Sequence, residues 1–200
     1  MFTGIIQHVG RLTALEPRDW GRRLIIDASG WSHTPGHGDS IAVDGCCLTV
    51  ADDAPDPAAL AFDVVTESLN LTRLGTTKVG GRVNLEHSVR ADTLMDGHIV
   101  QGHVDGLGRV RTIQDNAADW RVTIEPPIHL MECIAPKGSV TVNGVSLTIA
   151  TVHQDAFEVA LIPTTLELTN LGDLTAGDPV NVETDIVART VVHWLKRERG

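Results

Sequence analysis

One eleven-residue stretch of this chain occurs twice. Residues 40–50, SIAVDGCCLTV, return at residues 139–149 as SVTVNGVSLTI, and five of the eleven aligned positions are identical. Each copy has Asp-Gly or Asn-Gly near its centre, a pair that favours the type I′ turn of a β-hairpin because both turn residues must adopt positive φ. We therefore predict a pair of short antiparallel strands in each copy.

The two predicted hairpins each have one apolar face and one more polar face, because side chains alternate along a strand. The apolar face comprises Ile41, Val43, Cys46, Leu48 and Val50 in the first copy, and Val140, Val142, Val145, Leu147 and Ile149 in the second. The opposite face comprises Ser40, Ala42, Cys47 and Thr49, and then Ser139, Thr141, Ser146 and Thr148. One face is predicted to be core, and the other a small patch of hydroxyl and thiol groups that the chain presents twice.

The repeat extends far beyond the hairpins. Residues 3–12 match residues 101–110, and residues 69–86 match residues 166–183 with nine of eighteen positions identical. Offsets of 97 to 99 along the whole chain indicate a duplicated domain, since the repeats of a solenoid are much shorter. We predict one domain at residues 1–96, a second at residues 97–184 and a C-terminal helix at residues 185–200.

Many short predicted strands and one short helix in each half indicate a mainly all-β fold. We predict two tandem, homologous six-stranded Greek-key β-barrels, each with a short helix. The helix of the first half is expected to begin near Thr66 and that of the second half after Pro163, where Thr164 and Glu167 have capping-box spacing. The Asp- and Pro-rich residues 51–60 are expected to be a surface loop.

The C-terminal segment is predicted to be an amphipathic helix capped near Thr184 or Asp185. Its apolar stripe comprises Val187, Val191, Trp194 and Leu195. This stripe either folds back on a barrel or associates with another copy of the chain, and we favour self-association.

Composition excludes several classes of partner. The net charge of −10 argues against binding to a nucleic-acid backbone or an anionic membrane surface. The N-terminus lacks the features of a signal peptide, and no apolar run reaches the length of a membrane span. The three cysteines include the adjacent Cys46 and Cys47, which point to opposite faces of a strand and suit a reducing, cytoplasmic location.

Seven motifs follow one another along the chain: MFTGI, SIAVDGCCLTV, ESLNLTRLG, GHIVQGHVDG, KGSVTVNGVSLTI, LIPTTLELTNLG and VNVETDIVAR. Together they make essentially the whole chain resemble riboflavin synthases of the duplicated-barrel type. The resemblance implies a transferase without cofactor or metal. Such an enzyme dismutates two molecules of 6,7-dimethyl-8-ribityllumazine by four-carbon transfer, giving riboflavin and 5-amino-6-ribitylamino-uracil. It also implies a homotrimer held by C-terminal helices, with sites where the N-terminal barrel of one subunit meets the C-terminal barrel of another.

The resemblance further implies two sets of substrate-binding residues, one for each lumazine. The first set comprises Cys47, Leu48, Thr49, Asp63, Val64, Val65, Thr66, Glu67, Ser68, Gly102, His103 and Val104. The second set comprises Gly4, Ile5, Ile6, Ser146, Leu147, Thr148, Ala160, Leu161, Ile162, Pro163, Thr164 and Thr165. Lys137 is expected to reach the ligand, and Phe2 and Thr3 belong to an N-terminal motif that is expected to be ordered over the site.

Five residues are candidates for chemistry: His103, Cys47, Ser146, Thr148 and Ser40. His103 either plays a structural role or removes a proton from the 7-methyl group of the lumazine, and we favour the proton transfer. Cys47 either adds to carbon 7 as a thiolate, activates water there, or only lines the site. Ser146 and Thr148 are assigned to binding and positioning, and Ser40 to assistance on the same face.

The two halves differ where a dismutation needs a donor and an acceptor. Cys47 stands opposite Ser146 in the repeat, and Ile5 stands opposite His103. Lumazine- and flavin-carrying antenna proteins share the duplicated fold without catalysing, but the polar residues in both halves favour an enzyme. A purely structural trimer would leave the repeated polar face unexplained.

One position departs from the family pattern. Asp96 precedes Gly97-His98 where the family usually has Gly-Gly-His, and a positive φ there would strain an aspartate. His98 and His103 lack an acidic third ligand at metal spacing, so no zinc site is expected.

Overall fold

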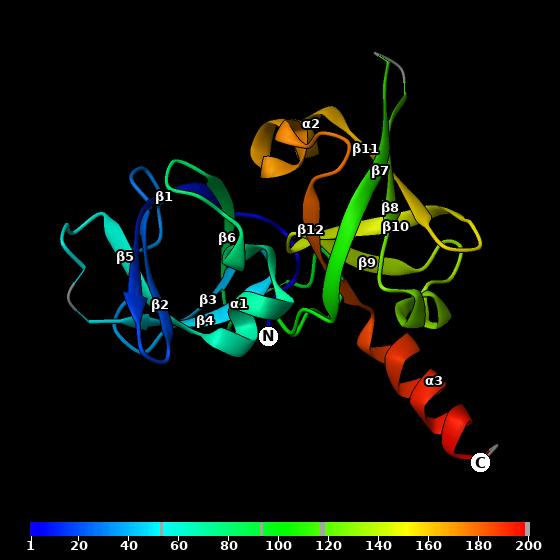
Figure 1. Ribbon diagram of the computed structural model, residues 1–200, viewed down its shortest axis with the longest axis horizontal. Coiled ribbons are helices and arrows are strands. Elements are labelled where there is room, and N and C mark those ends of the chain that lie inside the picture. Colours follow the sequence, from blue (N-terminus) through cyan, green and yellow to red (C-terminus); the bar gives the residue numbers. More distant parts are fainter. Residues whose placement is uncertain (53, 93, 117–118, 199–200) are drawn as a thin grey trace.

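The computed structural model describes residues 1–52, 54–92, 94–116 and 119–198, and it contains two closed antiparallel β-barrels that lie side by side (Figure 1). The strands of the first barrel are β1 (His8–Arg18), β2 (Gly21–Asp27), β3 (Ser40–Val43), β4 (Cys46–Ala51), β5 (Ala59–Val65) and β6 (Arg82–His87). Those of the second are β7 (Gly106–Asn116), β8 (Asp119–Glu125), β9 (Ser139–Val142), β10 (Val145–Val152), β11 (Phe157–Leu161) and β12 (Pro179–Thr184).

Both barrels have the same topology. The first closes in the order β1-β2-β5-β4-β3-β6, and replacing each strand by its repeat gives the order of the second. Because β2 lies beside β5 rather than β3, the connections are of the Greek-key kind. The predicted fold class is confirmed.

Short helices connect the strands, and one longer helix ends the chain. They are α1 (Thr66–Leu71), η1 (Arg73–Gly75), η2 (Ile128–Cys133), α2 (Pro163–Leu168), η3 (Asn170–Asp173) and α3 (Ile186–Glu198). The capping box predicted at Thr164 and Glu167 is wrong, because Ile162 is the N-cap of α2 and no side chain caps it. Pro163 instead occupies the first turn, where a missing N–H costs nothing.

The predicted hairpins form with the expected turns and faces. Asp44 and Gly45 have φ of 47° and 79°, and Asn143 and Gly144 have φ of 48° and 79°. The apolar faces of both hairpins enter the two separate barrel cores, whose largest side chains include Phe62 and Phe157 respectively.

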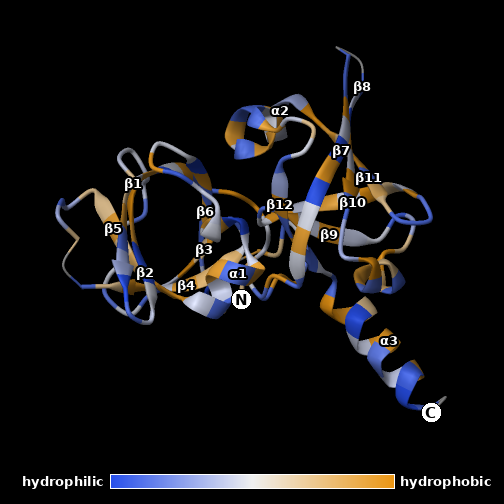
Figure 2. Cartoon of the chain, in the orientation of Figure 1, coloured by the Kyte–Doolittle hydropathy of each residue, from blue (hydrophilic) through white to orange (hydrophobic). Residues whose placement is uncertain are grey.

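Helix α3 extends away from both barrels (Figure 1), and apolar and hydrophilic residues alternate along it (Figure 2). Its cap is confirmed, since the Val187 N–H donates to Asp185 Oδ1 at 2.7 Å. The side chains of the predicted stripe are exposed, with Val187 at 61% and Trp194 at 60%. Among the described residues, no helix is both long and apolar enough to cross a bilayer.

The barrels contact each other through their two tight turns. A Cβ atom placed on Gly45 would lie 2.7 Å from the backbone nitrogen of Gly144, and one placed on Gly144 would lie 2.6 Å from that of Gly45. Real Cβ atoms do not approach so closely, so both positions require glycine for space as well as for positive φ.

A buried set of asparagines hydrogen-bonds across this contact. Asn84 Nδ2 donates to the Asn143 carbonyl at 2.9 Å, and the repeat-related Asn181 Nδ2 donates to the Asp44 carbonyl at 2.8 Å. The backbone N–H groups of Asn84 and Asn181 donate in turn to the side chains of Asp44 and Asn143. Each barrel therefore satisfies polar groups of the other.

The repeat-related residues Arg73 and Asn170 complete this network differently. Each donates its backbone N–H to a buried asparagine, Arg73 to Asn181 Oδ1 and Asn170 to Asn84 Oδ1. Both side chains then converge on the fully buried Asp44, which accepts from Arg73 Nη1 at 2.7 Å and from Asn170 Nδ2 at 2.7 Å. The Arg73–Asp44 ion pair thus breaks the symmetry of this network.

We predict that Asn84→Ala lowers the free energy of unfolding by about 3 kcal/mol, because it leaves several buried groups without partners. Urea unfolding followed by circular dichroism measures the change. Asn70→Ala, at an exposed position of α1, is the control and should change stability by no more than about 0.5 kcal/mol. Equal effects of the two substitutions would contradict a role of the network in joining the barrels.

Candidate functional site

The N-terminal segment pairs with the segment that links the two barrels. Phe2 and Val100 form an antiparallel bridge in which each N–H donates to the other's carbonyl, at 2.8 and 3.1 Å. The Phe2 ring is fully buried against Ala42, Val100 and Cys47. The N-terminal motif is therefore ordered, as the sequence predicts.

The two segments cross over. The segment before the first barrel lies on the hairpin of the second barrel, and the segment before the second barrel lies on the hairpin of the first. Residues 3–5 precede the first barrel, yet the Gly4 carbonyl accepts from the Ser146 N–H of the second barrel at 2.8 Å. Residues 101–103 precede the second barrel, yet the Gly102 carbonyl accepts from the Cys47 N–H of the first at 2.8 Å. The structure thus brings together Cys47 with Gly102, and Ser146 with Gly4, as the two predicted sets require.

Both crossing segments need glycine at the point of contact. Gly4 and Gly102 have φ of 77° and 79°. A Cβ on Gly4 would lie 2.6 Å from the Ser146 Cβ, and one on Gly102 would lie 2.7 Å from the Cys47 Cβ. Any side chain at either position would push the segment off its hairpin.

Two buried glutamates, which the sequence analysis did not assign to the site, hold the crossing segments. Glu86 accepts from the Thr3 N–H and hydroxyl at 2.6 and 2.7 Å and from the Gly4 N–H at 3.0 Å. Glu183 accepts from the N–H groups of Gln101, Gly102 and His103 at 2.7 to 3.0 Å. Their repeated Val-Asn-Leu/Val-Glu setting was the signal that could have identified them.

Burial raises the pKa of both glutamates. For Glu183 it rises to about 7, since the backbone N–H donors and Arg189 only partly offset the burial, while Asp105 adds repulsion. For Glu86 the N–H groups of Thr3 and Gly4 oppose the effect of burial. The two carboxylates form matched anchors for the segments that carry Ile5 and His103.

Cys47 is a protonated thiol at neutral pH. Burial raises its pKa, and this outweighs the lowering by the chain's N-terminal ammonium group and by the hydrogen-bonded Ser40 hydroxyl. Ser40 and Cys47 thus lie near each other on one face of the hairpin, where β3 and β4 pair. A thiol with a raised pKa is a poor nucleophile, which weakens the covalent alternative for Cys47.

Ser146 has a histidine partner, His98, that the sequence did not predict. His98 Nδ1 lies 2.7 Å from Ser146 Oγ. Burial lowers the pKa of His98, with Asp185 opposing, so the imidazole is neutral at pH 7. A neutral imidazole that carries its proton on Nε2 can accept the hydroxyl proton of Ser146 at Nδ1.

Beside each patch, two strands of the barrel stop pairing. The register of β4 with β5 comprises Val50↔Phe62 and Ala51↔Ala61 and does not continue towards the turn. In the second barrel, the pairing of β10 with β11 likewise ends at Ile149↔Val159. Backbone donors and acceptors along residues 47–49 and 146–148 thus face residues 63–68 and 160–165 without a closed strand ladder.

The members of the two predicted sets differ in what they can offer to a ligand. Leu48, Val64, Leu147 and Leu161 point into the barrel cores, so only their backbone atoms are available. Thr49, Thr148, Val65 and Ile162 are exposed. The Asp63 carboxylate is already paired, because Arg23 Nε and Nη2 donate to its two oxygens at 2.7 and 3.0 Å.

His103 and Ile5 occupy repeat-related positions at the exposed edges of the crossing segments. The His103 N–H is held by Glu183, while its ring is exposed. Asp96 is exposed and does not have positive φ, so the strain considered for this position does not arise.

Lys137 adopts a left-handed backbone conformation, and the equivalent residue of the first half is a glycine, Gly38. Its φ is 64°, and Gly38 at the equivalent position has φ of 86°. The two N–H groups make the same hydrogen bond, to the carbonyls of Ile149 and Val50. A lysine kept in a conformation that favours glycine suggests that its exposed side chain has a function.

The model of the lumazine binding domain family matches the chain twice, at residues 3–88 and 101–185. Over 200 residues the chain is 45% identical to riboflavin synthase of Mycobacterium tuberculosis, and the match covers 98% of both chains. It is 35% identical to riboflavin synthase of Bacillus subtilis, with 98% of this chain and 91% of the relative covered. The chain belongs to the riboflavin synthase family.

Solved structures of LumP, which is similar to this chain in fold, contain a ribityl lumazine or a flavin. LumP complexed with 6,7-dimethyl-8-(1'-D-ribityl) lumazine superimposes with a TM-score of 0.82 at 29% identity, covering 92% of this chain and 99% of LumP. LumP complexed with riboflavin gives a TM-score of 0.83 at 30% identity, with the same coverage.

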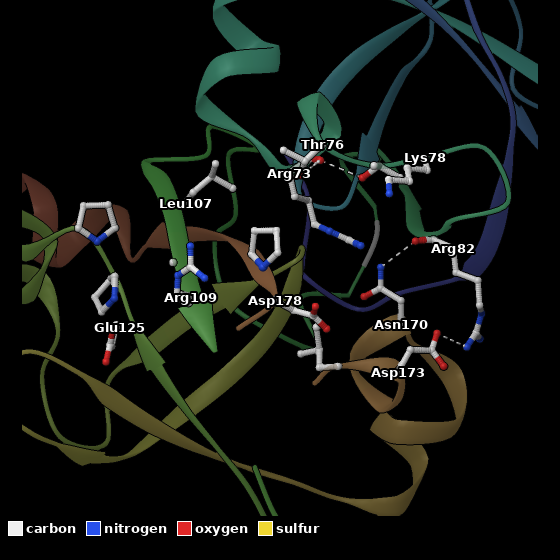
Figure 3. Close-up of a pocket in the computed structure, with 16 residues that line it drawn as sticks. Arg73, Thr76, Lys78, Arg82, Leu107, Arg109, Glu125, Asn170, Asp173 and Asp178 are labelled. Carbon is white, nitrogen blue, oxygen red and sulfur yellow. Dashed lines mark hydrogen bonds and ion pairs between the residues drawn. The ribbon is translucent and has the colours of Figure 1, made fainter. Parts of the chain in front are cut away.

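A large cleft lies elsewhere, between the barrels, and contains none of the residues that the family resemblance predicts (Figure 3). It has a volume of about 950 Å³ and is lined by residues of both barrels. Several of its charges are already paired: Arg73 with Asp44, and Arg82 with Asp173. The cleft shares no residue with the two patches described above.

No metal site emerges in the part of the chain that the structure describes, where no three His, Cys, Asp or Glu side chains are grouped to hold an ion. The chemistry available at the two patches comes from hydroxyl, thiol and imidazole groups and from backbone atoms.

We predict that Cys47 reacts slowly with iodoacetamide at pH 7 and faster as the pH rises past 9, because its raised pKa keeps the thiolate fraction small. Peptide mass mapping of the native protein measures the rate. Ser40→Ala removes the hydroxyl that lowers this pKa and should slow the reaction further, while Ser139→Ala serves as the control. Rapid modification at pH 7 would show that Cys47 is a thiolate.

Proposed function

We propose that this protein catalyses the dismutation of two molecules of 6,7-dimethyl-8-ribityllumazine. One molecule donates a four-carbon unit and becomes 5-amino-6-ribitylamino-uracil, and the other accepts the unit and becomes riboflavin. The observation that carries the proposal is the reciprocal crossing of residues 3–5 and 101–103, which builds two equivalent patches with unlike side chains. A reaction between two copies of one substrate needs two similar binding sites and unequal chemistry in them.

Binding is assigned to backbone and hydroxyl groups. The strand edges at residues 47–49 and 146–148 are not covered by β5 and β11, and they present backbone groups to the pyrimidine-dione ring. The N–H groups of Cys47 and Ser146 are excepted, because they already donate to the Gly102 and Gly4 carbonyls. The exposed hydroxyls of Thr49 and Thr148 suit the ribityl chain, and Lys137 is placed next to Thr148 because its N–H binds the Ile149 carbonyl. The ligands bound to LumP, a lumazine and riboflavin, support this assignment.

Catalytic roles follow the differences between the patches. His103 removes a proton from the 7-methyl group of one lumazine, at a position where the first half has the inert Ile5. Ser146, with His98 as its proton acceptor, activates or orients the nucleophile at the other patch. Cys47, hydrogen-bonded to Ser40, stays neutral and lines the site.

We further propose that three copies assemble through α3. The stripe side chains are exposed and belong to neither barrel core: Val187, Val191, Trp194 and Leu195. Burying such a stripe against another copy stabilises the assembly by about 25 cal/mol for each Å². The free Cys46, Cys47 and Cys133 suit a cytoplasmic location.

Purified protein freed of bound flavin should convert two lumazines into one riboflavin and one ribitylamino-uracil, which chromatography can quantify. Sedimentation of the same preparation gives its mass, which should be that of a trimer. Tight binding of the lumazine without turnover would instead identify a carrier. His103→Gln should abolish most turnover and retain binding.

We predict that Lys137→Gly raises the free energy of unfolding by about 1 kcal/mol, because glycine adopts positive φ without strain. The same substitution should weaken lumazine binding about tenfold, since a hydrogen bond from a charged group is lost. Urea unfolding and a fluorescence titration measure the two effects. Lys137→Asn, which tolerates the same φ, should weaken binding to a similar extent with little gain in stability, and unchanged affinity in both variants would remove Lys137 from the site.

A further inference from the structure

Arg189 of α3 reaches back to the segment that carries His103. Its guanidinium donates through Nη1 to Asp105 Oδ1 and through Nη2 to Gln101 Oε1. The Asp105 carboxylate also accepts from the Thr184 N–H at 2.8 Å and the Thr184 hydroxyl at 2.7 Å. Residues 101–105, the end of β12 and the first turns of α3 are therefore joined by one set of charge-assisted hydrogen bonds.

The described residues of the first half, 1–52 and 54–92, show no such connection. Gln7 stands where the second half has Asp105, and its Oε1 accepts from the His87 N–H at 3.2 Å as Asp105 accepts from Thr184. Thr3 stands where the second half has Gln101, and its hydroxyl donates to Glu86 rather than to a helix. Both substitutions within the repeat, to Asp105 and Gln101, supply the acceptors that Arg189 uses.

We propose that Arg189 is a positioning residue that fixes the His103 segment to α3, so that this segment is held more firmly than its counterpart at residues 3–5. The inference rests on the proposed function only for the role of His103; the attachment of the segment can be measured without any substrate. Arg189 acts through the backbone of residues 101–103 and does not touch a reacting atom.

The charges around Glu183 make this attachment sensitive to pH. Glu183 must be ionised to accept from three N–H donors with both oxygens. Facing it are Asp105 before β7, which raises its pKa, and Arg189 on α3, which lowers it. The remaining ionisable neighbours are Cys46 and Cys47 on β4 and, beside Asp105 and Arg189, Cys133 on η2.

Loss of the Arg189 charge therefore favours the protonated form of Glu183. A protonated carboxyl turns one oxygen into a donor, which opposes the Gln101 N–H if that oxygen is Oε1, and the N–H groups of Gly102 and His103 if it is Oε2. Residues 101–103 are then held less firmly as the pH falls through neutrality, and the hydrogen bonds to Glu183 form again at higher pH.

The test compares Arg189→Gln and Arg189→Lys with Lys196→Gln in the full-length protein. Lys196 lies on the same helix and forms an exposed ion pair with Glu132 at 2.5 Å, so its substitution is a matched control. Hydrogen exchange of the Gln101, Gly102 and His103 amides reports the attachment directly. The pH profile of kcat/KM for lumazine dismutation and the sedimentation mass are measured on the same samples.

In Arg189→Gln we expect the amide hydrogens of residues 101–103 to exchange at least tenfold faster at pH 7 than in the wild type. The acid limb of the kcat/KM profile should move to higher pH. Turnover at pH 7 should fall about ten- to a hundredfold, because a displaced proton acceptor loses its alignment. Arg189→Lys keeps the charge but makes fewer hydrogen bonds. Its acid limb of the kcat/KM profile should therefore lie between those of the wild type and Arg189→Gln. Lys196→Gln should match the wild type within about twofold, as exposed ion pairs contribute little.

Wild-type exchange at residues 101–103 in Arg189→Gln would overturn the proposal, whatever the change in activity. The proposal would also be overturned if Lys196→Gln accelerated amide exchange at residues 101–103 as much as Arg189→Gln does. The same holds if Arg189→Gln lost activity only because its subunits dissociate, with amide exchange unchanged. If the wild-type protein fails to dismutate the lumazine, the proposed function fails, while the exchange measurement still decides the role of Arg189.

Discussion

The contact between two tight turns is the constraint on which the rest of this structure depends. The turns at residues 44–45 and 143–144 approach so closely that neither glycine can carry a side chain. Burying polar backbone there is tolerable only because asparagine side chains satisfy it from the opposite barrel. This contact sets how the barrels lie, and so where the crossing segments meet the opposite hairpins.

Within this near-symmetric frame, a few substitutions create different chemical environments. At one patch a neutral thiol lies beside a serine, and at the other a serine lies beside a neutral imidazole. The segment above the first patch ends in a histidine and the segment above the second in an isoleucine. The backbone geometry stays the same in both, so the differences reside in side chains alone. Duplication supplies the binding, and divergence supplies the inequality that the proposed reaction needs.

The sequence predicted the barrels because their signals are local. Alternating side chains and the Asp-Gly and Asn-Gly turns specify the hairpins, and the constant offset specifies the duplication. The roles of Glu86, Glu183 and His98 depend on contacts between residues that are 48 to 83 positions apart, such as those of His98 with Ser146 and of Glu86 with Thr3. A single sequence carries no distance information of this kind, although the repeated glutamate was visible. Family resemblance supplied the pairing of Cys47 with Gly102, which local patterns could not.

The exchanged segments have a consequence for how such a chain could arise. Each half donates its leading segment to the other, and the two turns meet as related surfaces, which is the arrangement of an isologous dimer made within one polypeptide. In a dimer of identical single-barrel chains, every mutation would appear in both sites at once. Joining the two copies in one gene releases that restriction, because Cys47 can then change without Ser146 and His103 without Ile5. Covalent fusion is thus what allows two sites of common origin to take opposite parts in the proposed reaction.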